Sequence, residues 1–169
     1  MTNRLSISDN IFSAEEHKYI VEYCQSCSYF YGEKDTPDTP SCGMVHNIQK
    51  GFSEKDEYIY DLMSNKIEND LYPDAKKLTL YRMYVNCFSP GDSPWFHTDG
   101  KSGLTFLYYA NREEWDINDG GETQFYIDGM LTGVPPIPNR IAIFTPDQLH
   151  CAKSFRDRYK FTVATKYEG

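Results

Sequence analysis

Two stretches near the start of the chain carry apolar residues at helical spacing. Ser13 and Glu16 form a capping box ahead of apolar positions that recur every three or four residues, which predicts a helix over residues 13–27. A second apolar stripe follows Ser53 and is stopped by Pro73. The first part of the chain is therefore expected to contain two helices.

After residue 77 the pattern changes to the alternation of apolar and polar residues that is typical of strands. Turn signals such as Pro90-Gly91-Asp92 and Asp128-Gly129 separate these segments. The expected strands cover residues 44–48, 78–88, 104–110, 123–127, 140–144 and 160–165. We predict a mainly β (α+β) fold: a double-stranded β-helix, or jelly roll, of about eight strands flanked by two N-terminal helices. One domain is expected over residues 1–169, with helical support over about 1–77 and the jelly roll over about 78–169.

Composition and charge narrow the class of protein. The formal net charge of −8 disfavours general binding to nucleic acid, because an acidic surface repels phosphates. An aromatic share of 15% favours a β-rich core. The odd count of five cysteines fits reduced thiols, and the sequence shows neither a secretory signal nor an apolar run that could span a bilayer. A cytosolic protein is expected.

Candidate chemistry lies in His97-Thr98-Asp99 and in His150. Two imidazoles and one carboxylate form the facial triad that holds a non-haem Fe(II) and leaves coordination positions open. Residues two apart on an extended strand share a face, so His97 and Asp99 can both point at one ion. The alternative is that both histidines are ordinary core or loop residues, because a His-x-Asp triplet alone is weak evidence.

A series of motifs runs through residues 80–167. They are Phe88-Ser-Pro-Gly-Asp92, Phe96-His-Thr-Asp99, Leu104-Thr-Phe-Leu-Tyr-Tyr-Ala-Asn111 with Trp115, Gly120-Gly-Glu-Thr-Gln-Phe125, Pro138-Asn-Arg-Ile-Ala-Ile-Phe144, His150 and Arg158-Tyr-Lys-Phe-Thr-Val163. In these motifs, their order and their spacings, residues 80–167 resemble the catalytic core of the Fe(II)/2-oxoglutarate-dependent dioxygenases, in particular the prolyl 4-hydroxylase-like branch.

The resemblance implies roles for particular residues. His97, Asp99 and His150 would be the iron ligands, and Arg158 and Tyr109 would hold the distal carboxylate of 2-oxoglutarate. Thr162 and Leu107 would line the co-substrate pocket, and Glu122 would be structural. Arg158 shares strand parity with Thr162, but Arg156 shares it too and remains the reserve candidate for the anchor.

One position departs from the family pattern. Members commonly carry a tyrosine just before the Pro-Gly turn, where this chain has Phe88. Tyr84, four residues earlier on the same strand face, or Tyr81 could take over the contact with the co-substrate.

The implied reaction is hydroxylation of a C–H bond with Fe(II), 2-oxoglutarate and O2, with ascorbate as a candidate reductant. A proline-containing peptide is the favoured substrate, and Trp95 and Tyr31 are candidates to line its groove, although both could equally be core residues. The alternatives are the same chemistry on a small molecule or a nucleic acid, or an inactive jelly-roll binding module. The segment Arg158–Ala164 lacks the asparagine and second arginine that nucleic-acid demethylases carry, and the length fits a minimal bacterial or viral version of the family.

A zinc-like set of ligand types occurs in the N-terminal part. It consists of Cys24, Cys27, Cys42 and His46. Because the first two cysteines fall on the apolar face of the expected helix, buried reduced thiols are the favoured interpretation.

Overall fold

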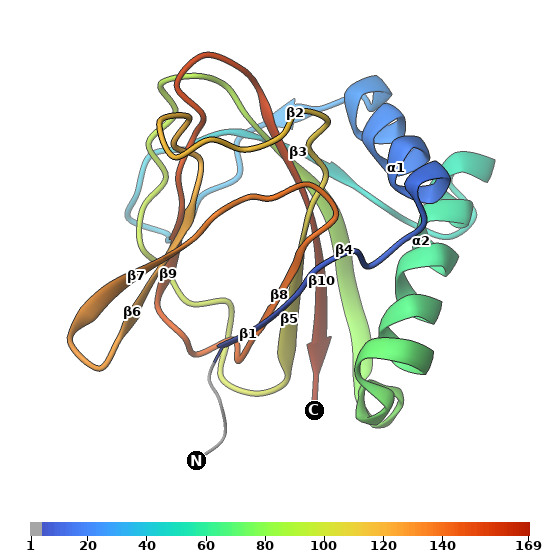
Figure 1. The fold of residues 1–169 in the computed structure, drawn as a ribbon. Helices are drawn as coiled ribbons and strands as arrows, with labels where there is room; N and C mark the ends of the chain where they lie inside the picture. Colours follow the sequence, from blue (N-terminus) through green and yellow to red (C-terminus); the bar gives the residue numbers. More distant parts are fainter. Residues whose placement is uncertain (1–4) are drawn as a thin grey trace.

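A computed structural model describes residues 5–169 of the chain. Ten strands form two sheets, and two helices cover one face of the larger sheet (Figure 1). The bounds are β1 Leu5–Ser8, α1 Ala14–Ser26, β2 Phe30–Tyr31, β3 Met44–Asn47, α2 Glu54–Lys66, β4 Thr79–Phe88, β5 Leu104–Tyr109, β6 Thr123–Ile127, β7 Met130–Val134, β8 Ile141–Phe144, β9 His150–Ala152 and β10 Lys160–Glu168. The predicted jelly-roll class with two flanking helices is confirmed.

Both helices start where the sequence predicts. Ser13 accepts a hydrogen bond from the backbone of Glu16, whose carboxylate in turn accepts one from the backbone of Ser13, so the capping box is complete. Helix α2 is capped by Ser53 and runs into a π-helical turn, Ile67–Leu71. Pro73 then opens a 3-10 turn that leads into β4.

The larger sheet has the order β1-β8-β5-β10-β4-β3-β2, with antiparallel pairing throughout. The smaller sheet has the order β7-β6-β9. One hydrophobic cluster fills the space between the helices and the larger sheet, and a second lies between the two sheets. Strand β10 therefore sits at the centre of the larger sheet, with one face towards each cluster.

Four strands are not among those expected: β1, β2, β7 and β9. Strand β7 follows the Asp128-Gly129 turn, in which both residues have positive φ, as a two-residue hairpin turn requires. Four of the five residues of β7 are exposed. Because the strand has no buried face, its sequence shows no alternation of apolar and polar residues that could have predicted it. None of the helices among residues 5–169 is both long and apolar enough to cross a membrane.

Candidate metal and co-substrate site

The three predicted ligands meet between the two sheets. His97 and His150 exchange backbone hydrogen bonds of 2.9 and 3.0 Å, which bring their rings to 4.4 Å between centroids. The amide of Asp99 is fixed by the carbonyl of Pro146 at 2.7 Å. His97 thus lies on an isolated bridge rather than within a strand, yet the i, i+2 spacing still directs both side chains to one point.

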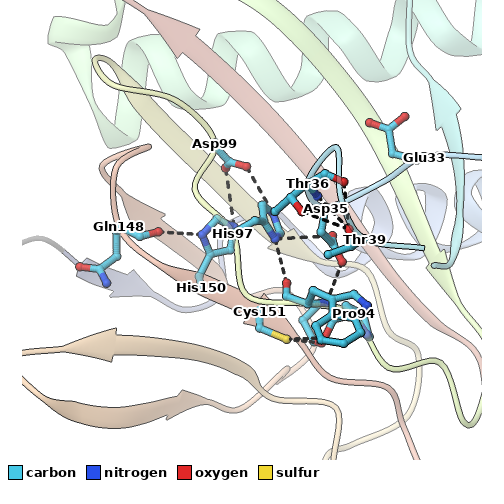
Figure 2. Close-up of polar contacts among 12 residues, drawn as sticks. Glu33, Asp35, Thr36, Thr39, Pro94, His97, Asp99, Gln148, His150 and Cys151 are labelled. Atoms are coloured by element: carbon cyan, nitrogen blue, oxygen red, sulfur yellow. Dashed lines mark hydrogen bonds and ion pairs between the residues drawn. The ribbon is translucent and has the colours of Figure 1, made fainter. Parts of the chain in front are cut away.

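The donor atoms suit a divalent cation. One ligand atom from each of the three residues lies within 4.8 Å of the others, and within residues 5–169 this is the one such cluster. The Nδ1 atom of His150 faces the carbonyl of Gln148 at 2.9 Å (Figure 2). The Nδ1 atom of His97 faces the carbonyl of Trp95 at 3.1 Å. A carbonyl can only accept, so each Nδ1 carries the proton and each Nε2 offers its lone pair towards Asp99.

Electrostatics act differently on the three residues. Burial lowers the pKa of His97, but Asp99, the carbonyl of Trp95 and Asp35 raise it by more. Burial lowers the pKa of His150 to about 4, so the ring is neutral at neutral pH. Burial raises the pKa of Asp99, but His97, His150 and Lys166 lower it by more, and the carboxylate stays ionised. One oxygen of Asp99 accepts from the hydroxyl of Thr105 at 2.8 Å and the other from the ammonium of Lys166 at 2.7 Å.

A cavity of about 200 Å³ opens beside the three ligands. Its walls come from alternate residues of adjacent strands, as period-two geometry requires. They include Arg82, Tyr84, Asn86 and Phe88 of β4, Thr105 and Leu107 of β5, Thr123 of β6, and Lys160, Thr162, Ala164 and Lys166 of β10. Leu107, Thr162 and Tyr84 thus all line this cavity, and Phe88 lines it without a hydroxyl.

Arg158 does not reach this cavity, which corrects its expected position. The chain bends over residues 156–158, and β10 begins only at Lys160, so strand parity does not extend back to Arg158. Its guanidinium pairs with Asp119 at 2.9 Å and stacks on the ring of Phe155. The reserve candidate Arg156 also lies outside, and its Nε donates to the carbonyl of Asn118.

Lys160, two residues after Arg158, does line the cavity. The residue is fully buried, and within the described chain its ammonium donates to one partner, the carbonyl of Lys153, at 3.0 Å. Burial lowers the pKa of Lys160 to about 7. The sequence signal was available, because Lys160 shares a strand face with Thr162 and lies only two residues from it.

Tyr109 stands behind the cavity wall rather than in it. The side chain is fully buried, and its hydroxyl donates to Thr123 Oγ1 at 2.7 Å. Thr123 lines the cavity, so Tyr109 supports the wall through this hydroxyl.

The loop between β2 and β3 borders the cavity (Figure 2). Asp35 accepts from the backbone amide of Trp95 at 2.7 Å and lies 3.5 Å from Nδ1 of His97. Glu33 pairs with Arg82 at 2.7 Å. Trp95 and Tyr31 are 53% and 68% exposed and do not line the cavity, so neither is a core residue.

The zinc-like residues do not form a site with one another. His46 contacts Asp56 at 3.2 Å and the carbonyl of Ser28 at 3.0 Å, and Cys24 is completely buried within α1. Within residues 5–169 they do not come together as a group of metal ligands.

Comparisons with solved structures find proteins that share this fold, whereas no family model and no curated sequence matches the chain. A prolyl-4-hydroxylase from Pseudomonas putida superposes with a TM-score of 0.79 at 16% identity, covering 99% of this chain and 94% of that one. A prolyl hydroxylase from Trichoplax adhaerens, in complex with a peptide of hypoxia inducible factor, gives 0.75 at 18%, covering 99% and 84%. The non-heme alpha ketoglutarate dependent epimerase SnoN from nogalamycin biosynthesis gives 0.72 at 12%, covering 98% and 77%. The chain has the fold of the 2-oxoglutarate- and Fe(II)-dependent oxygenases, with prolyl 4-hydroxylases among the similar structures.

Proposed function

We propose that the protein is an Fe(II)- and 2-oxoglutarate-dependent dioxygenase that hydroxylates a C–H bond. The observation that carries the proposal is the combination of two imidazoles, one ionised carboxylate and a buried lysine around a single cavity. The metal would activate O2, so that one oxygen atom enters the substrate as a hydroxyl and the other enters succinate as 2-oxoglutarate loses CO2.

Different residues of this chain would bind the metal and the co-substrate. His97, Asp99 and His150 would hold the metal, and Lys160 would pair with the distal carboxylate of 2-oxoglutarate. Burying a carboxylate without a cationic partner costs free energy. Within the described chain the ammonium of Lys160 donates to one backbone carbonyl, so it has further N–H groups to donate to the carboxylate of 2-oxoglutarate. Leu107 and Thr162 would contact the chain between the two ends of the co-substrate, and the fixed Nδ1–H groups keep the metal-binding nitrogens in place.

Anaerobic titration with Fe(II) and 2-oxoglutarate tests the proposal. We expect a weak visible metal-to-ligand charge-transfer band, followed under air by slow formation of succinate, with or without ascorbate. A matched pair of variants tests the anchor: Lys160→Met should weaken 2-oxoglutarate binding, whereas Arg158→Ala should leave it unchanged. No band in protein whose site was initially metal-free would contradict the reaction class.

A proline-containing peptide is the favoured substrate within this reaction class. Support comes from the fold shared with prolyl hydroxylases, one of them solved with a peptide, and from the exposed rings of Trp95 and Tyr31 beside the cavity loop. Exposed aromatic side chains are typical anchors for peptides. Turnover of 2-oxoglutarate should rise with proline-containing peptides, and Trp95→Ala should raise the KM for such a peptide.

The epimerase among the similar structures favours a small molecule as the second candidate. A rise in turnover with small molecules and with no peptide would select it.

A further inference from the structure

Lys166 makes a direct contact with a proposed metal ligand. Its ammonium lies 2.7 Å from one oxygen of Asp99, and both side chains are largely buried, at 11% and 3% exposure. Thr105 holds the other oxygen of the same carboxylate. Each oxygen of Asp99 therefore has a protein donor, and only one of the two donors carries a charge.

Stability alone does not explain a lysine at this position. In the β10–β4 register Lys166 stands directly opposite Arg82, and like charges in such a pair destabilise a sheet. Both cations lie over the ring of Tyr84, at 5.2 and 4.1 Å from its centroid. A buried ion pair can often be replaced by apolar residues without loss of stability, so a cation here points to another use.

We propose that Lys166 sets the charge of the metal centre: its positive charge lowers the affinity for the divalent ion and raises the affinity for the anionic co-substrate. The inference rests on the proposed function. The positive charge of Lys166 competes with a divalent ion for Asp99 and also repels that ion once it is bound. The same charge raises the positive potential that attracts the carboxylate end of 2-oxoglutarate that chelates the metal.

Charge and hydrogen bonding at Asp99 can be separated by substitution. Lys166→Gln keeps an N–H donor but removes the charge, and Lys166→Arg keeps the charge. Thr105→Val removes the neutral donor alone. Lys77→Met is the matched control, because Lys77 pairs with Asp74 at 2.6 Å on an exposed turn.

The affinities for Co²⁺ and for 2-oxoglutarate are the two quantities to measure. Co²⁺ is titrated into metal-free protein without oxygen by its visible spectrum, and 2-oxoglutarate is then titrated at saturating Co²⁺. We expect Lys166→Gln to bind Co²⁺ more tightly and 2-oxoglutarate more weakly, because removing a positive charge relieves repulsion of the cation and weakens attraction of the anion. The size of each change should be about 10- to 100-fold, which is the range by which substituted partners of metal ligands alter affinity. Lys166→Arg and Lys77→Met should keep both affinities, and Thr105→Val should weaken Co²⁺ binding only.

Opposite changes in the two affinities are the decisive signature. A merely structural role of Lys166 would weaken both in Lys166→Gln, and unchanged affinities would leave it no role; either result would overturn the inference. Failure of this inference can be told apart from failure of the proposed function. If the proposed function is wrong, the wild-type protein itself shows no Co²⁺ spectrum that depends on His97. Should Lys166→Gln not fold, Lys166→Met tests the same loss of charge: opposite changes in the two affinities support the inference, and any other result contradicts it.

Discussion

The buried ammonium of Lys160 should make stability depend on pH in a specific window. Its pKa is about 7 in the folded chain against an ordinary 10.5, so the unfolded chain binds more protons between these values. Stability should therefore rise with pH from about 7 towards 10.5, by up to about 1.4 kcal/mol per pH unit from this group. Below pH 7 the full penalty of the buried charge applies, with a ceiling of roughly 5 kcal/mol for a pKa of about 7 in place of 10.5.

Urea unfolding of metal-free wild type and Lys160→Met at pH 7, 7.5, 8 and 8.5 measures this contribution. The variant should be the more stable protein at pH 7, and its advantage should shrink as pH rises. Burial raises the pKa of all five thiols, which lowers stability at higher pH, but that contribution is common to both proteins and cancels.

The same group should link co-substrate binding to proton uptake. A bound carboxylate favours the ammonium form of Lys160, so above pH 7 the affinity for 2-oxoglutarate should fall by up to about tenfold per pH unit. Calorimetry in buffers of different ionisation enthalpy reports the proton taken up. Parallel stability profiles for the two proteins, together with binding that takes up no proton, would refute the reasoning.

Three further substitutions test the site and the fold. His97→Ala should abolish succinate formation while leaving the urea midpoint of the metal-free protein near that of wild type; residual metal-dependent turnover would contradict its role as a ligand. Tyr109→Phe should cost about 1–3 kcal/mol of stability, because buried Thr123 loses its partner, and should weaken 2-oxoglutarate binding far less than Lys160→Met does; an equal loss would indicate direct contact. Gly103→Ala should destabilise by more than about 2 kcal/mol in urea unfolding, since Gly103 has φ +110° and a Cβ there would collide with the carbonyl of Tyr167; a midpoint like that of wild type would contradict this.

The elements with strong local signals could be predicted from the sequence. The capping box set the start of α1, and alternation located β4, β5, β6 and β8 to within about one residue, whereas β10 runs about three residues beyond its expected end. The ligand cluster was predictable because His-x-Asp fixes two ligands locally and His150 is the one histidine after it.

Features that depend on distant partners could not be found in this way. Strands β1 and β9 are only four and three residues long, and their pairing partners supply most of their order. Lys160 is an exception, because the expected strand already began at residue 160. The preference for Arg158 extended the strand parity back across residues 156–158, where the chain bends. The contact of Lys166 with Asp99 joins residues 67 positions apart, which no local pattern encodes.

The interleaving of site and core on β4 and β10 has a consequence for how the protein opens. Val85 and Val163 are completely buried in the core beneath the helices, and their immediate neighbours Tyr84 and Thr162 line the cavity. The cavity wall therefore cannot unfold locally without exposing the core, so its backbone amides should exchange with solvent only through global unfolding. Ligands that bind at this wall should then raise the free energy of global unfolding, because they bind the folded chain and not the unfolded chain.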